Sequence, residues 1–187
     1  MTLIRRAGKL LGWLLTILIA ALVLMWVLAL EREDDPSVPP GTRLVDTSLG
    51  RVAVAESGPV SGPPVLLIHG TAGWSGFWRE VSAHLAARGW RVIAADVPPF
   101  GYSSHDPQGR YGRTDQARRL AEVLRATTAG RPAMIVAHSF GAGAGAELAL
   151  VDPAAVAGLV LVDPALGVPD AAPAGAGALG LRIIAEP

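Results

Sequence analysis

One turn in the sequence constrains the fold more than any other feature. Residues 133–137 form an apolar run typical of a buried strand, and a helix pattern of small residues begins directly after Ser139. A strand that passes straight into a helix presents the intervening serine hydroxyl on a sharp turn. The two backbones nearly touch there, so small residues are required two positions before and after the serine, where Ala137 and Gly141 stand. We expect a positive φ at Ser139, which a non-glycine residue adopts only when its surroundings hold it.

The rest of the sequence alternates short apolar segments with amphipathic ones. Continuous apolar strands that alternate with helices indicate a mostly parallel sheet covered by helices on both faces, which is an α/β fold. A polar turn between two β-type segments adds a hairpin in front of this sheet. The expected hairpin strands are 43–46 and 51–56, the later strands 65–69, 90–95, 133–137 and 156–162, and the helices 77–88, 114–128 and 140–151.

The predicted helix over 114–128 has a clear amphipathic pattern. Thr114 is expected to cap its N-terminus. Leu120 and Leu124 lie on the expected inward face, and Arg118 and Arg119 on the expected outward face.

Polar residues follow four of the predicted strands. His69 and Gly70 lie at the carboxyl end of the first parallel strand, and Asp96, Ser139 and Asp163 lie at the same end of the next three. In parallel sheets, ligands bind beyond the carboxyl ends of the strands. We therefore expect the functional site at this edge.

The N-terminal region carries a membrane signal. Residues 10–30 are 21 residues without a charge, and as a helix they would be about 31 Å long, close to the ~30 Å hydrocarbon core of a bilayer. Basic residues precede this run and acidic residues follow it, which predicts a cytoplasmic N-terminus and an extracytoplasmic folded domain. The alternative is a cleaved signal peptide, whose apolar region is shorter and ends at a small-residue cleavage site.

The chain is thus predicted to have five parts. Residues 1–9 are cytoplasmic, 10–30 span the membrane as a single pass, and 31–42 form a proline-rich linker. Residues 43–166 form the α/β core. Residues 167–187, rich in alanine, glycine and proline, form a flexible tail or the start of a cap.

Composition excludes several classes of function. The net charge is zero and no basic block lies beyond the N-terminus, so no nucleic-acid partner is expected. The absence of cysteine excludes thiolate metal sites and cysteine nucleophiles, and the four histidines lack metal-ligand spacing. Gly141, Gly143 and Gly145 suggest a dinucleotide-binding loop, but their strict alternation differs from G-x-G-x-x-G, and close packing of helix on sheet explains them better.

Three ordered motifs give the chain a family resemblance. Residues 69–74 read His-Gly-Thr-Ala-Gly-Trp after a strand, residues 96–103 read Asp-Val-Pro-Pro-Phe-Gly-Tyr-Ser, and the turn at Ser139 follows. Over residues 43–166 the chain resembles the N-terminal part of the α/β-hydrolase superfamily. The resemblance implies a serine hydrolase that needs no cofactor or metal and cleaves an ester, thioester or related acyl bond in a small-molecule substrate.

The same resemblance assigns roles to individual residues. Ser139 is the implied nucleophile, and the backbone N–H groups of Thr71 and Phe140 are the implied oxyanion donors. His69, Gly70 and Asp96 are interpreted as the scaffold of the loops. His138 precedes the nucleophile, so its side chain is expected to point away from Ser139. A serine at this position argues against epoxide hydrolases and haloalkane dehalogenases, relatives that use an aspartate there.

The resemblance leaves the catalytic acid and base open. Asp163 is a candidate acid because it ends a strand, although the family usually places this residue one strand later. No histidine follows Ser139, where the family places its base. We therefore expect the chain to be part of a longer hydrolase and to have little activity alone. The alternative is a non-catalytic, membrane-tethered binding module with a degenerate hydrolase fold.

Overall fold

The computed structural model describes residues 2–30 and 38–166, and within the first range it describes side chains only for Lys9 and residues 12–25. Contacts divide the chain into two units, residues 1–36 and 37–187. The predicted tail over 167–187 lies outside the described residues, as do residues 31–37 of the predicted linker.

The first unit is the helix α1 (Thr2–Leu30). Its described side chains are exposed, including large apolar ones such as Trp13 and Met25. Among the described residues, no helix combines the length and the apolar character that a membrane crossing needs. The structure therefore does not support the predicted transmembrane segment, which stays a prediction from the sequence.

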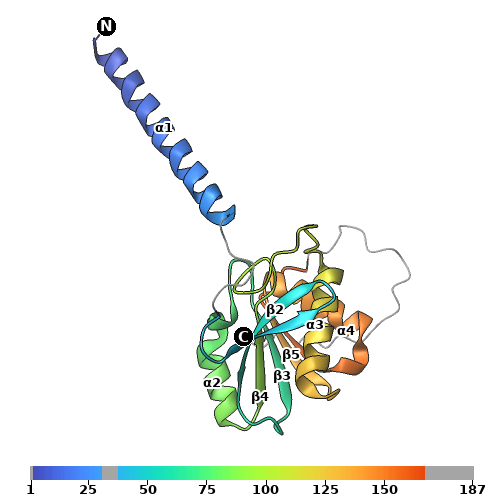
Figure 1. Cartoon of the computed structure of the whole chain (residues 1–187). Coiled ribbons are helices and arrows are strands. Elements are labelled where there is room, and N and C mark those ends of the chain that lie inside the picture. The colour runs from blue at the N-terminus through green and yellow to red at the C-terminus, as the bar shows by residue number, and fades with distance from the viewer. Residues whose placement is uncertain (1, 31–37, 167–187) are drawn as a thin grey trace. The chain divides into compact units, whose positions relative to one another are not determined.

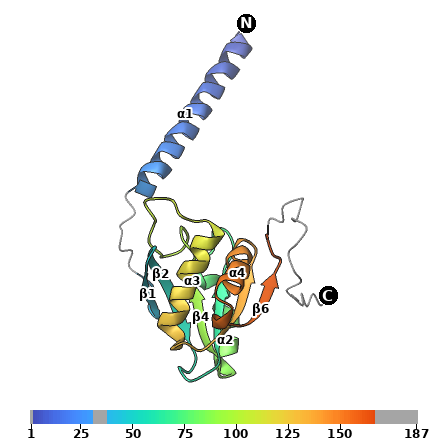
Figure 2. The same ribbon diagram turned by 90° about the vertical axis from the view of Figure 1, so that its right-hand side faces the viewer.

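The second unit is built on a sheet whose described strands run in the order β1-β2-β4-β3-β5-β6. The hairpin β1–β2 and the β2–β4 pair are antiparallel, and β4, β3, β5 and β6 run parallel. The hairpin lies at one edge and β6 at the other (Figure 2). The strands are β1 (Thr42–Thr47), β2 (Gly50–Ser57), β3 (Pro64–Ile68), β4 (Arg91–Ala95), β5 (Ala133–His138) and β6 (Val156–Val162).

Helices cover both faces of this sheet (Figure 1). The helix α2 (Arg79–Ala87), which follows the short 3₁₀ turn η1 (Ser75–Trp78), lies on one face. The helices α3 (Arg113–Thr128) and α4 (Phe140–Val151) lie together on the other, and a second 3₁₀ turn, η2 (Pro153–Ala155), leads into β6. This mixed, mostly parallel sheet with helices on both faces confirms the predicted α/β class.

The central strands are buried on both faces, as their continuous apolar sequence predicts. Every residue of β3 and β4 is buried. Leu66 and Ile68 pack into the cluster beneath α3 and α4, whereas Val65 and Leu67 pack into a second cluster with Trp78. Because successive side chains of a strand point to opposite faces, β3 contributes to the core on each face of the sheet.

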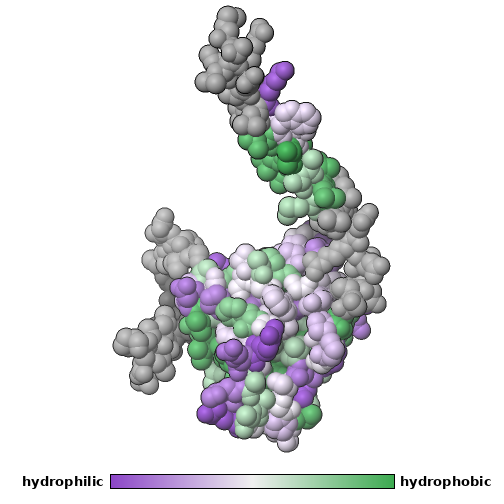
Figure 3. Space-filling model, turned by 90° about the vertical axis from the view of Figure 1, so that its left-hand side faces the viewer, coloured by the Kyte–Doolittle hydropathy of each residue, from purple (hydrophilic) through white to green (hydrophobic). Residues whose placement is uncertain are grey.

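The face of the sheet that carries α2 is less well covered near β6. Val160 and Val162 remain 45% and 42% exposed, and they lie beside Val136 and His138 in the register of β5 and β6. Figure 3, which views the molecule from this side, shows hydrophobic surface on it. Leu159 and Leu161 point to the opposite face, where they pack against the larger core.

Two details of the predicted helices are wrong. The segment predicted as one helix from Phe77 begins as the 3₁₀ turn η1, and α2 starts only at Arg79. Thr114 does not cap α3, because the N-cap is Gly112 and the Thr114 hydroxyl instead donates to Oε1 of Glu147 on α4 at 3.1 Å. The Thr114 hydroxyl thus bonds to a side chain on a neighbouring helix and not to the backbone at the start of its own helix.

The predicted exposure of Arg119 is also wrong. Its side chain is only 1% exposed and forms an ion pair with Asp106 at 3.0 Å, whose side chain is equally buried. Its guanidinium also donates to the carbonyl oxygens of Leu49 at 3.1 Å and Arg110 at 2.7 Å. The loop before α3 folds back over this helix and supplies acceptors that the helical periodicity of α3 alone cannot reveal. Hydrogen bonding to Arg110 is the main cause that lowers the pKa of Asp106.

Neighbouring arginines on α3 allow a matched test of this buried pair. Replacing Arg119 by Met is expected to lower the free energy of unfolding by about 3–5 kcal/mol, because the buried carboxylate of Asp106 and two backbone carbonyls each lose one donor. Replacing the exposed Arg118 by Met is expected to change it by less than about 0.5 kcal/mol. Urea unfolding followed by tryptophan fluorescence measures both, and equal effects would contradict the assignment.

Candidate active site

Ser139 occupies the turn between β5 and α4 in the strained conformation that the sequence predicts. Its φ is 50° and its ψ is −119°. The Ser139 N–H donates to the carbonyl of Val162 at 3.1 Å, and its own carbonyl accepts from the N–H groups of Ala142 at 3.0 Å and Ala165 at 3.1 Å. The backbone of the turn is therefore held by α4 and by β6 with the residues that follow it. The Ser139 side chain is partly exposed, and its hydroxyl has no hydrogen bond to residues 38–166.

Two glycines allow the neighbouring loop to approach this turn. A Cβ on Gly141 would collide with the carbonyl oxygen of His69, so α4 rests directly on the end of β3. A Cβ on Gly70 would lie 3.0 Å from Cβ of Ser139 and 2.8 Å from Nδ1 of His138. Both distances are shorter than ordinary packing tolerates, so the loop after β3 and the serine turn touch through glycine backbone.

Two backbone N–H groups near this contact have no acceptor among the described residues. Thr71 follows Gly70, and Phe140 is the first residue of α4 after Ser139. Within residues 38–166, neither N–H donates to a protein acceptor. Unpaired amides beside a serine on a strained turn are the arrangement that stabilises negative charge on an acyl oxygen.

Aromatic side chains tie this region together. The Phe100 ring makes an edge contact with the His69 ring at 6.2 Å between centroids and another with the Phe140 ring at 6.1 Å. Phe100 belongs to the loop after β4, His69 follows β3, and Phe140 begins α4. The Phe100 ring therefore contacts both the segment after β3 and the start of α4.

His69 has the hydrogen bonds of a structural residue. It is fully buried, its Nδ1 donates to the carbonyl of Gly70 at 2.7 Å, and its Nε2 accepts from the N–H of Val97 at 2.8 Å. Burial lowers the pKa of His69, outweighing the raising effects of the Gly70 hydrogen bond and the Asp96 charge. A neutral ring with both nitrogens engaged links two loops and has no nitrogen left to accept a proton from Ser139.

Asp96 is a second buried link between the same loops. Its Oδ1 accepts from the N–H of Ser75 at 2.5 Å, and its Oδ2 accepts from the N–H of Tyr102 at 2.8 Å. The side chain is fully buried. Gly101 is required beside it, because a Cβ there would collide with the carboxylate.

The sequence analysis missed one member of this framework, Ser103. Its hydroxyl donates to the carbonyl of Asp96 at 2.6 Å and accepts from the N–H of Ala53 at 2.8 Å. The sequence contains a signal for this role, because Ser103 is the last residue of the second motif. In the structure Ser103 is only 2% exposed.

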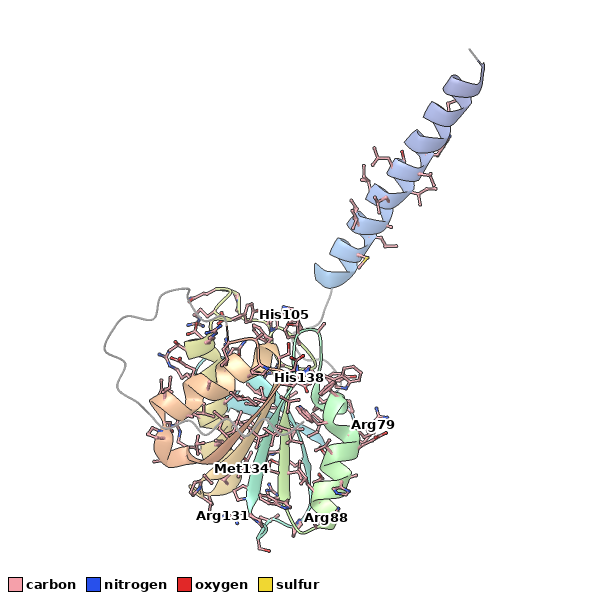
Figure 4. The ribbon with its side chains drawn as sticks, turned by 180° about the vertical axis from the view of Figure 1, so that it is seen from behind. Arg79, Arg88, His105, Arg131, Met134 and His138 are labelled. Carbon is pink, nitrogen blue, oxygen red and sulfur yellow. The ribbon has the colours of Figure 1, made fainter. Side chains whose placement is uncertain are left out.

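Asp163 and His138 lie apart from this framework. Asp163 follows β6 with a φ of 44°, and its exposed side chain has no hydrogen bond or ion pair to the described residues. His138 ends β5 (Figure 4), and its ring stacks on Phe77 at 5.1 Å between centroids. The Nδ1 of His138 is buried and has no hydrogen-bond partner among the described residues. The geometry assigns neither residue a proton-transfer partner.

Comparison with known proteins now identifies the family. The family model described as the alpha/beta hydrolase fold matches residues 63–179. More than half of the chain is covered, so the protein belongs to the α/β-hydrolase family.

The relatives are hydrolases of several kinds and a subunit of another enzyme. The chain is 40% identical over 106 residues to a Variovorax paradoxus protein named as a carbamate hydrolase, RutD, covering 57% of this chain and 40% of the relative. It is 34% identical over 103 residues to the magnesium-chelatase 30 kDa subunit of Rhodobacter capsulatus, covering 54% and 34%. It is 43% identical over 77 residues to a haloalkane dehalogenase of Mycobacterium marinum, covering 41% and 22%. The chain thus spans well under half the length of these curated relatives.

Solved structures show the same fold. A thioesterase domain from the curacin biosynthetic pathway superposes with a TM-score of 0.61 at 29% identity, covering 66% of this chain and 46% of that one. Epoxide hydrolase A from Mycobacterium thermoresistibile gives the same TM-score and identity, covering 66% and 39%.

The role of Asp96 can be tested against Asp163. Replacing Asp96 by Asn places an amide donor against one of two backbone N–H donors, and we expect a loss of roughly 1–3 kcal/mol in the free energy of unfolding. The same change at the exposed Asp163 is expected to cost less than about 0.5 kcal/mol. Chemical denaturation distinguishes the two, and a neutral Asp96→Asn variant would show that the carboxylate does not organise the loops.

Proposed function

We propose that this chain carries the nucleophile and the oxyanion hole of a serine hydrolase that cleaves an ester, thioester or related acyl bond. The observation that supports this most is the strained turn at Ser139, packed against Gly70 and followed by an amide that has no acceptor within residues 38–166. The hydroxyl oxygen attacks the acyl carbon, and the carbonyl oxygen takes up the negative charge of the tetrahedral intermediate.

The oxyanion is stabilised by the N–H groups of Thr71 and Phe140. Both amides are fixed before a substrate arrives. Buried links through His69 and Asp96 hold the loop that carries Thr71, and the backbone hydrogen bonds of Ser139 hold the turn that precedes Phe140. Fixed donors need no reorganisation when charge develops, and one such donor contributes roughly 10²–10³-fold to the rate. Collapse of the intermediate expels the leaving group and leaves an acyl group on Ser139.

The proton of the Ser139 hydroxyl requires a base, and the proposal assigns none of the four histidines to this role. All four precede Ser139 in the sequence. His69 uses both ring nitrogens within the loops, and His138 lies on the strand before the turn and stacks on Phe77. Without a base, a nucleophile with an oxyanion hole retains a small part of the catalysis, and an external base is expected to increase it.

Serine chemistry also separates this chain from some of its relatives. Haloalkane dehalogenases and an epoxide hydrolase are among the similar proteins. These classes use an aspartate at the position of Ser139, so the proposal favours acyl transfer as in the thioesterase neighbour. The alternative is a non-catalytic binding module. Absence of Ser139 labelling in the following experiment would favour that alternative.

A fluorophosphonate probe tests the proposal directly. With imidazole added as an external base, we expect mass spectrometry to find the adduct on Ser139 and to find none after Ser139→Ala. Thr71→Pro removes one N–H donor and is expected to slow labelling roughly 10²–10³-fold, whereas Thr71→Ala keeps the N–H and the rate. Circular dichroism of each variant confirms folding. Labelling that is absent, or indifferent to Thr71→Pro in a folded variant, would contradict the oxyanion assignment.

The membrane location is a separate part of the proposal. It rests on the uncharged run over residues 10–30 with basic residues before it and acidic residues after it. We propose a single-pass anchor with a cytoplasmic N-terminus and an extracytoplasmic hydrolase domain.

Alkaline carbonate extraction of cell membranes tests this anchor. The full chain is expected to stay in the membrane pellet, and a variant with Leu18 and Leu22 both replaced by Arg is expected to move to the soluble fraction, because charges at the centre of a span are costly. Release of the unchanged chain by carbonate would refute the anchor.

A further inference from the structure

A cavity whose lining differs from the serine site lies within the unit that contains the sheet. Its volume is about 510 Å³, which is within the range of small-molecule sites. Its lining does not include Ser139, Gly70 or Phe140. It opens between the segment before β1, strand β2, the start of α2 and the loops after β3 and β4, with Pro40, Glu56, Trp74, Arg79, Ser82 and Tyr102 among its walls.

The unpaired charge in this cavity is positive. Glu56 is already neutralised, because its two carboxylate oxygens accept from Arg43 at 2.9 Å and from Arg91 at 2.8 Å. Arg79 is exposed at the start of α2 and has no hydrogen bond or ion pair to the described residues. Figure 4 shows Arg79 on α2, at the opposite end of the helix from Arg88. An exposed guanidinium without a described partner is complementary in charge and shape to a carboxylate, which it can bind through two parallel hydrogen bonds.

An aromatic wall accompanies this charge. Trp74 is 45% exposed, although its indole is large and apolar. The ring lies so close to the backbone of Gly76 that a Cβ there would collide with the indole nitrogen. The ring is thus placed by the loop, and its exposed surface lines the cavity together with Pro39 and Pro40.

The backbone that carries these groups is preorganised. Ser75 and Tyr102 both line the cavity, and both donate their N–H groups to the buried carboxylate of Asp96. Preorganisation lowers the entropy lost when a ligand binds. The cavity is therefore lined by a cationic side chain, an exposed indole and backbone that Asp96 holds in place.

We propose that this cavity binds a small aromatic carboxylate, with its carboxylate on Arg79 and its ring against Trp74. The inference is independent of the proposed hydrolase function, because Ser139, Thr71 and Phe140 do not line the cavity.

Titration of the full chain in lipid nanodiscs with 2-naphthoate tests the site. Calorimetry is expected to show saturable binding of one ligand per chain, with a Kd of about 1 mM or tighter for a ligand of this size. The neutral analogue 2-naphthalenemethanol is expected to bind at least roughly tenfold more weakly, because it cannot pair with the guanidinium. Absence of saturable binding, or equal affinity for the two compounds, would overturn the proposal.

Three variants locate the binding. Arg79→Gln is expected to weaken 2-naphthoate binding roughly tenfold, whereas Arg118→Gln, which makes the same charge change on α3 at the other face of the sheet, is expected to leave it unchanged. Gly76→Ala displaces the Trp74 indole and is expected to weaken binding as well. Circular dichroism confirms that each variant is folded. Equal effects of the two arginine variants, or unchanged binding in both Arg79→Gln and Gly76→Ala, would refute the site.

Discussion

The contact between the loop after β3 and the turn after β5 is the constraint on which the rest of the site depends. Gly70 and Gly141 make this contact possible, because a side chain at Gly141 would overlap the backbone of His69 and one at Gly70 would crowd Ser139. The contact holds Ser139 at a φ of 50°, a conformation that costs roughly 1–3 kcal/mol and persists only under such packing. It also brings the amide after Gly70 next to the turn that carries the hydroxyl.

The parallel part of the sheet delivers the parts of the site to one edge. His69 follows β3, Asp96 follows β4 and Ser139 follows β5, and these strands are neighbours or next-but-one neighbours in the sheet. The two buried polar side chains, His69 and Asp96, form their hydrogen bonds with the backbone of the loops. His69 joins the loops after β3 and β4 through Gly70 and Val97, and Asp96 joins the same loops through Ser75 and Tyr102. Within residues 38–166, this frame uses neither the Ser139 hydroxyl nor the N–H groups of Thr71 and Phe140.

Most of this arrangement could be predicted from the sequence because it is local. The strand-to-helix turn at Ser139, the continuous apolar strands and the glycine at 141 each have a physical meaning within a few residues. Features that depend on distant partners could not be predicted. Arg119 has the periodicity of an exposed residue, yet Asp106 from the preceding loop and the carbonyl of Leu49 bury it. Thr114 has the sequence of a cap, yet its hydroxyl binds Glu147 on another helix. The cavity beside Arg79 is built by five separate segments, and no periodic pattern marks it.

A crystal structure of the protein with phenylboronic acid bound tests the central claim most directly, because a boronate on serine mimics the tetrahedral intermediate. The account predicts a covalent bond between boron and Oγ of Ser139, with one boronate oxygen about 2.7–3.2 Å from the backbone nitrogens of both Thr71 and Phe140. A boronate bound to Ser139 whose oxygens point away from both amides, or a Ser139 side chain buried out of reach of the reagent, would contradict it.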